Sequence, residues 1–269
     1  MRWLLMLVAF TGTGIANCVA ADAPPERSAF GVGQLLVTDP QSGTQVRLNL
    51  ARHHVHVVLH PPVALVQIDQ SFYNPYQFQQ EGKFVFNLPD GASVSRFAMF
   101  TTRAQLIEGE LIDRARAAGI YQSIVDRQRD PAILEQIGGN LFKMRVFPIP
   151  PRDTKRILLD YTVPLVEGAG GHCEFELPLM ADVQPIGDFA ITGAIRGPNV
   201  TGSAKSESHP EAKFDAAEGN VIRFELRKSA FRPVAPFTLR FQQQPSGGVT
   251  VRSYVPDQLA AVQNLPDEK

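Results

Sequence analysis

Four of the six histidines in the chain fall within one short alternating segment. They are His53, His54, His56 and His60. Because side chains of a strand alternate between its two faces, His54, His56 and His60 share one face. Neutral imidazole is a common zinc ligand, so this face is a candidate metal site. Positions two apart on a strand are separated by about 7 Å, however, and one zinc ion cannot bind all three histidines. The metal hypothesis therefore depends on His54 and His56 with a ligand from elsewhere. The alternative is a solvated strand face with cross-strand hydrogen bonds.

A predicted helix carries a second group of side chains that could bind a ligand. Its basic flank consists of Arg114, Arg116, Arg127 and Arg129. Guanidinium groups on one flank could bind a polyanion such as an acidic glycan. The alternative is an ordinary solvated helix face, because aspartates are interleaved with the arginines.

Three carboxylates form one pattern related to catalysis; the other candidate is Cys173, whose thiol would need exposure and a nearby base. Asp126, Asp130 and Glu135 are close in sequence, but glycoside hydrolysis needs two carboxyl groups that face one cleft. Asp130 is better explained as a helix cap before Pro131. The sequence has no nucleophile elbow, phosphate-binding loop, His-Glu-x-x-His or Cys-x-x-Cys motif. We therefore expect no enzymatic activity, no catalytic residue and no cofactor.

The segment from residue 111 to about 138 predicts a helix-turn-helix. Apolar residues recur with helical spacing at Ala117, Ile120, Tyr121, Ile124 and Val125. A second, short helix is expected over residues 132–137, and Gly138-Gly139 would end it. A strand then follows over residues 142–147, and the prolines at 148, 150 and 151 would end that strand.

The rest of the chain alternates as strands do. Examples are the apolar residues Val55, Val57 and Leu59, and later Ile157 and Leu159. We expect a mainly β fold, a sandwich of antiparallel strands with the helix-turn-helix packed on one edge. The strands on either side of residues 150–153 should form a hairpin. Residues 172–255 would form a β-rich extension, either a second sandwich or the second half of one, and residues 256–269 a linker or tail.

The N-terminus indicates export. Residues 1–23 combine Arg2, a short apolar run and small residues near Ala20 and Ala23, which is typical of a signal peptide. A lipid anchor on Cys18 is an alternative. No other run is long enough to cross a bilayer, so the mature chain should be secreted, periplasmic or bound to the cell envelope. Cys173 would then remain as a small buried strand residue. A net charge of -1 gives no reason to expect nucleic acid as a partner.

Motifs spread from about residue 35 to 165 resemble one known family. They include Asn74-Pro75, Ala117–Tyr121, Asp130–Glu135 and the run from Gly139-Asn140 to Pro150-Pro151. The segment resembles the VIT domain, the vault protein inter-alpha-trypsin domain. The resemblance assigns structural roles to Asn74, Pro75, Tyr121, Asp130, Pro131, Gly138, Gly139, Asn140, Phe147, Pro148, Pro150 and Pro151.

The resemblance also implies a non-enzymatic extracellular or scaffold module. Its partner would be a protein, such as a von Willebrand A domain in the same chain or in another. The Asp-x-Ser-x-Ser loop with which such a domain binds a metal ion is absent from this sequence. We thus expect an exported module for protein–protein association. The alternative is a ligand-binding module that uses the strand histidines or the basic helix flank.

Overall fold

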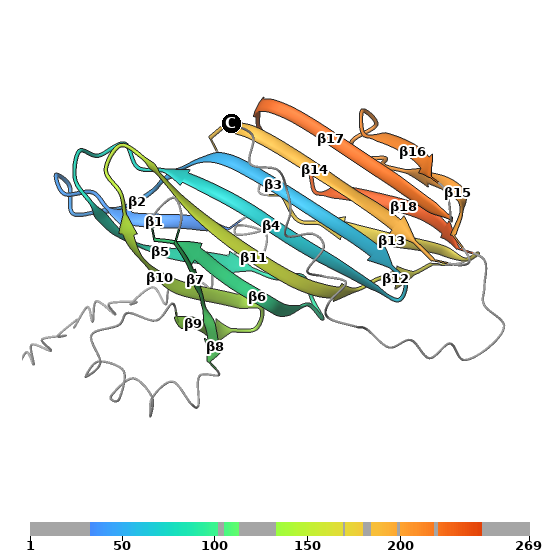
Figure 1. The fold of residues 1–269 in the computed structure, drawn as a ribbon, viewed down its shortest axis with the longest axis horizontal. Coiled ribbons are helices and arrows are strands. Elements are labelled where there is room, and N and C mark those ends of the chain that lie inside the picture. Colours follow the sequence, from blue (N-terminus) through green and yellow to red (C-terminus); the bar gives the residue numbers. More distant parts are fainter. Residues whose placement is uncertain are drawn as a thin grey trace, which may run out of the picture.

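The computed structural model describes residues 33–101, 105–112, 133–168, 170–179, 184–197, 200–217 and 220–243. Every regular element in these ranges is a strand, and the strands form three sheets (Figure 1). The prediction of a mainly β fold is confirmed. The expectation that all pairs are antiparallel is wrong, because β3 pairs with β14 and β8 pairs with β9 in parallel.

The largest sheet has eight strands and runs through most of the molecule (Figure 1). In spatial order its strands are β16 (Lys213–Ala217), β17 (Val221–Phe231), β14 (Ile186–Arg196), β3 (Asn49–His60), β4 (Val63–Tyr73), β11 (Thr154–Pro164), β6 (Ser93–Phe100) and β7 (Leu106–Glu108). We call it the long sheet. Strands β3 and β14 form the parallel pair of this sheet. Two parallel strands need a crossover connection, and the chain makes one when it leaves the sheet after β11 and returns at β14.

Two smaller sheets complete the fold. The six-stranded sheet is ordered β2 (Gln45–Arg47), β1 (Gln34–Thr38), β5 (Gln80–Asn87), β10 (Leu141–Ile149), β9 (Ile133–Gly138) and β8 (Glu110–Ile112). The four-stranded sheet is ordered β12 (Val166–Glu167), β13 (His172–Leu177), β18 (Phe237–Gln243) and β15 (Val200–Lys205).

Both smaller sheets pack on the same face of the long sheet. Phe84 of the six-stranded sheet lies 5.8 Å from Phe72 and 6.1 Å from Phe97, measured between ring centroids. At the other end, Phe237 of the four-stranded sheet stacks on Phe224 at 6.2 Å. These contacts belong to one continuous apolar core. The alternating pattern of each strand follows from this arrangement, because one face is buried in the core and the other is polar.

The predicted short helix over residues 132–137 is wrong. Residues 133–138 are strand β9, which pairs with β10 in an antiparallel hairpin. Gly139 and Asn140 form its two-residue turn, and Gly139 has a φ of 52°. A glycine with positive φ serves equally at a helix end and in a hairpin turn, so Gly138-Gly139 did not distinguish the two. Leu111 and Ile112 are also in a strand, β8.

The remainder of the expected helix-turn-helix lies outside the described residues. That part contains Tyr121, Asp130 and Pro131, as well as the basic flank at Arg114, Arg116, Arg127 and Arg129.

The hairpin expected across residues 150–153 is also wrong. Strand β10 pairs with β5 and β9 of the six-stranded sheet, whereas β11 pairs with β4 and β6 of the long sheet. The segment between them therefore carries the chain from one layer of the sandwich to the other. Pro150 and Pro151 lie in this crossing, and Phe147 and Pro148 lie at the end of β10.

Buried Asn74 fixes this crossing in place. Its side-chain amide lies 3.0 Å from the carbonyl oxygen of Pro150, 3.2 Å from that of Phe78 and 3.4 Å from that of Ile149. Its Oδ1 accepts a hydrogen bond from the amide of Tyr76 at 3.0 Å. The side chain thus satisfies backbone groups where four strand ends meet, which gives Asn74-Pro75 a structural role.

Replacing Asn74 with alanine should destabilise the fold by about 2–3 kcal/mol, because buried backbone groups lose their partners. Urea unfolding of the purified protein measures this loss. Asn49→Ala, at the exposed start of β3, is the matched control and should change stability by less than about 0.5 kcal/mol. Equal stabilities of the two variants would contradict the role assigned to Asn74.

Candidate functional site

The histidine strand β3 lies in the middle of the long sheet, with His54 and His56 on the face away from the core. Its parallel neighbour β14 places Ala190 beside His54 and Thr192 beside His56. On the other side, β4 places Asp69 beside His54 and Gln67 beside His56. His53 points into the core, where it lies 3.0 Å from the amide nitrogen of Gln70. The expected shared face of His54 and His56 is therefore present. We call this polar side of the long sheet its outer face.

His54 belongs to a row of charged groups that crosses four strands. The guanidinium of Arg156 donates two hydrogen bonds to Asp69, at 2.8 and 2.9 Å. Arg52 lies 3.7 Å from the same carboxylate and donates to Nδ1 of His54 at 3.0 Å. Because an arginine can only donate, Nδ1 of His54 must accept and the proton must be on Nε2. That Nε2 lies 2.7 Å from the carboxylate of Asp188.

The neighbours of His54 act on its pKa in opposite directions. Burial lowers the pKa below its ordinary value, the charge of Arg52 lowers it further, and Asp188 and Asp69 act against both. Both ring nitrogens are engaged in the neutral form, so His54 has no nitrogen left to act as a metal ligand or a general base.

Replacing Asp188 with asparagine should lower the pKa of His54 further, because the charge and hydrogen bond of Asp188 raise it. An NMR titration of the His54 Cε1 proton measures this shift. Glu176→Gln, on an exposed position of β13, is the control and should leave the His54 pKa where it is. An unchanged His54 pKa in Asp188→Asn would contradict the proposed contact.

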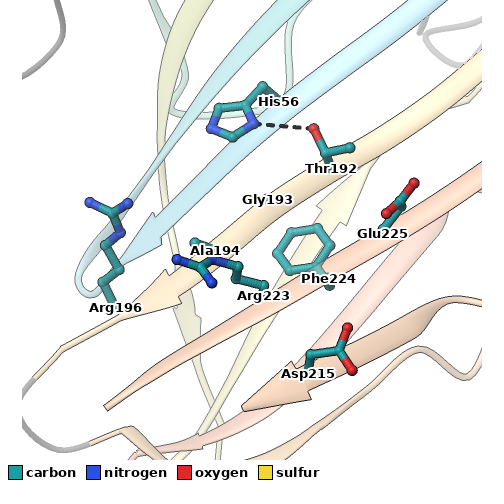
Figure 2. Close-up of a pocket in the computed structure, with 9 residues that line it drawn as sticks. All are labelled: His56, Thr192, Gly193, Ala194, Arg196, Asp215, Arg223, Phe224 and Glu225. Atoms are coloured by element: carbon teal, nitrogen blue, oxygen red, sulfur yellow. Dashed lines mark hydrogen bonds between the residues drawn. The ribbon is translucent and has the colours of Figure 1, made fainter. Parts of the chain in front are cut away.

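Next to this row, a hollow of about 310 Å³ opens on the outer face (Figure 2). It extends over β3, β14, β17 and β16. Nδ1 of His56 lies 3.2 Å from the hydroxyl of Thr192 at one side of it. Burial, and then the charge of Arg196, lower the pKa of His56. His56 is therefore neutral near pH 7 and available as a hydrogen-bonding group.

Two arginines of the hollow lack ion-pair partners. Among the described residues, neither Arg196 nor Arg223 has a carboxylate oxygen within 4.0 Å. Asp215 is registered directly opposite Arg223, yet these two also form no ion pair. Six other arginines on strands do pair with carboxylates: Arg52, Arg96, Arg145, Arg156, Arg227 and Arg240. The hollow thus concentrates charge that the fold itself does not neutralise.

The family comparison assigns the central part of the chain. The model of the vault protein inter-alpha-trypsin domain, VIT, matches residues 50–161. This segment is a VIT domain. It contains nearly all of β3 and β11 and every strand between them, whereas β1 and β2 of the six-stranded sheet precede it. No curated protein matches the chain.

Solved structures give more distant similarities. A structure of "a putative nutrient binding protein" from Legionella pneumophila subsp. pneumophila has a TM-score of 0.46 and 12% identity, over 78% of this chain and 71% of that chain. The M1 zinc metallopeptidase of Deinococcus radiodurans has a TM-score of 0.41 and 12% identity, over 72% of this chain. The match covers 42% of the peptidase chain. Within its described ranges, the chain has no helix of the length and apolarity that a membrane span requires.

The hollow extends across the boundary of the VIT domain. The domain contributes His56, whereas Thr192, Arg196, Arg223 and Asp215 come from strands that follow it in sequence. Sequence reasoning identified the histidines but none of these four residues. The signal that was present, alternating polar residues on β14 and β17, marks an outward face but does not identify its neighbour across the sheet.

Two further features of the described residues concern metal binding and Cys173. The described residues contain no group of three or more histidine, cysteine, aspartate or glutamate side chains that could hold a metal ion. Cys173 is buried in β13, as predicted, and burial raises the pKa of its thiol. Its Sγ donates to the side-chain oxygen of Gln243 at 3.4 Å.

Proposed function

We propose that this chain is an exported, non-enzymatic module that associates with a protein partner at the cell envelope or outside the cell. VIT domains are typically extracellular interaction modules, and this chain contains one. The binding surface in this proposal is the outer face of the long sheet. The partner is a von Willebrand A domain, in the same chain or another, or an envelope protein.

The arrangement of the outer face is the observation that carries this proposal. His54 is the group of this face closest in type to a catalytic base. Both of its ring nitrogens are hydrogen-bonded, one to Arg52 and the other to Asp188. Beside it, the charged side chains of Arg196, Arg223 and Asp215 line an open hollow (Figure 2). Catalysis needs reactive groups that converge on one point, whereas protein association uses charge spread over a surface.

Site-specific photo-crosslinking in the cell of origin tests the proposal. A photoreactive amino acid at position 225 or 227, both exposed on the outer face of β17, should give a discrete crosslinked protein after irradiation. The control position is Lys83, which is exposed on the six-stranded sheet and distant in topology from the outer face. Crosslinks that are absent at all positions, or that are identical from position 83, would overturn the proposal.

A further inference from the structure

The hollow on the outer face has an excess of positive charge. Its unpaired groups among the described residues are two guanidiniums, Arg196 and Arg223, and one carboxylate, Asp215. Glu225 also lines the hollow, but Arg227 pairs with it. His56 is neutral at pH 7 because burial and Arg196 lower its pKa. The unpaired groups of the hollow therefore carry one more positive charge than negative charge.

The charges are also segregated within the hollow. In register, Arg196 is opposite Val221 of β17, two positions before Arg223, so the two arginines are diagonal neighbours about 7–8 Å apart at their Cα atoms. Figure 2 shows both guanidiniums near the arrowhead of β14 and the carboxylates of Asp215 and Glu225 farther from it, although Asp215 is opposite Arg223 in register. This gives the hollow a basic side and an acidic side.

Hydrogen-bond donors accompany the basic side. The Thr192 hydroxyl and Nδ1 of His56 satisfy each other at 3.2 Å, which leaves Nε2 of His56 to bond elsewhere. Figure 2 shows this second ring nitrogen on the side of Arg196. Two guanidiniums with a neighbouring imidazole form a typical setting for a carboxylate, which arginine binds through paired N–H groups.

We propose that this hollow binds one acidic side chain from an extended segment of the protein partner, with its carboxylate between Arg196 and Arg223. This inference rests on the proposed function, because it assigns the site and the partner chemistry of the same surface. A basic side chain two positions along that segment lies on the same side of it, about 7 Å away, and faces Asp215. The preferred sequence is thus an acidic residue, any residue, and a basic residue.

A polyanion fits this surface less well. A sulfated glycan or a run of acidic residues would bring a second negative charge toward Asp215 and Glu225. That charge would be repelled by the two carboxylates. The acidic side of the hollow therefore selects for a single carboxylate rather than for negative charge in general.

Short peptides test the inference directly on the full chain. The probes are the acetylated and amidated tripeptides Glu-Ala-Lys, Glu-Ala-Gln and Gln-Ala-Lys, with sodium acetate and sodium sulfate as free anions. NMR titration of the His56 ring protons reports binding. We expect Glu-Ala-Lys to bind most tightly, Gln-Ala-Lys to bind at least about tenfold more weakly, and the His56 pKa to rise when Glu-Ala-Lys is bound.

Variants then separate the basic side from the acidic side. Arg196→Gln and Arg223→Gln should each weaken Glu-Ala-Lys binding by about tenfold. Asp215→Asn should remove the preference for Glu-Ala-Lys over Glu-Ala-Gln, because the basic residue loses its partner. Arg232→Gln, an exposed arginine outside the hollow, is the matched control and should bind within about twofold of the original protein.

Three results would overturn the inference: equal affinity for Glu-Ala-Lys and Gln-Ala-Lys, sulfate binding tighter than any peptide, or unchanged binding by both arginine variants. The crosslinking experiment keeps this failure separate from that of the proposed function. If the partner still crosslinks at an unchanged level from position 225 of an Arg196→Gln/Arg223→Gln protein, the module binds its partner without the hollow. If the peptides bind as expected but no partner crosslinks, the hollow stands and the proposed function fails.

Discussion

Replacing Gly193 with alanine is expected to destabilise the protein by about 3 kcal/mol or more. Gly193 lies in β14, between β3 and β17. A Cβ atom at this position would lie 2.2 Å from the backbone oxygen of Val57 and 2.4 Å from Cζ of Phe224. Both distances are well inside van der Waals contact, and the carbonyl belongs to a strand held on both sides. The sheet must therefore distort to accept one methyl group.

A second substitution shows which contact dominates. Phe224→Leu in the Gly193→Ala background removes the ring but leaves the Val57 carbonyl, so we expect it to restore little of the lost stability. The control is Gly197→Ala, just after β14, where the nearest atom is a methyl group of Val200 at 3.3 Å. That variant should lose less than about 1 kcal/mol in urea unfolding. A Gly193→Ala protein as stable as Gly197→Ala would show that β3 and β14 leave room for a methyl group between them.

Gly193 matters because it lies where the VIT domain joins the rest of the fold. Strand β3 belongs to residues 50–161, whereas β14 and β17 follow them, and the three strands share one sheet. Phe224 covers Gly193 on the core side and reaches Phe237 of the four-stranded sheet. The same three strands hold the polar hollow on the outer face. A distortion at Gly193 should therefore also weaken peptide binding in the hollow.

The sequence was informative where structure is local. Alternation at residues 157–163 predicts β11, and every second residue of that strand is buried. The sequence was ambiguous at Ile133–Gly138, because six residues with three apolar members and a glycine at the end fit a short helix or a hairpin strand. The structure resolves this through pairing with β10, which is a tertiary contact that local spacing does not encode.

The candidate site shows the same limit more clearly. His54 and Asp188 are 134 positions apart and meet only because β3 and β14 pair in parallel. The sequence identified the histidine but not its partner. Conversely, nothing in the sequence indicates a cation in the core, because a lysine at the start of a strand usually reaches solvent.

Lys155 is that cation. Its side chain shares the core face of β11 with Ile157, and the residue is 1% exposed. Its ammonium has no hydrogen-bond partner in the structure. Burial lowers the pKa of Lys155 from 10.5 to about 8. The charged form is thus less stable in the folded protein than in the unfolded chain, which is a cost that the fold carries at neutral pH.

Replacing Lys155 with methionine should therefore stabilise the protein by about 2 kcal/mol at pH 7, because a side chain of similar length fills the site without a charge. The pH dependence gives a second measure. Between pH 8 and 10.5 the unfolded chain binds the lysine proton and the folded protein does not, so the stability of the original protein rises with pH. Below pH 8 both states are protonated and the full cost remains. The advantage of Lys155→Met should accordingly shrink across this window, when the two proteins are unfolded with urea at each pH. The difference in stability between the two proteins cancels the opposing contribution of buried Tyr161, because burial raises the pKa of Tyr161 in both.

Lys83→Met, on an exposed position of β5, should change stability by less than about 0.5 kcal/mol at every pH. A Lys155→Met protein less stable than the original at pH 7 would show that the ammonium has a bound partner, because removing a satisfied charge destabilises a core.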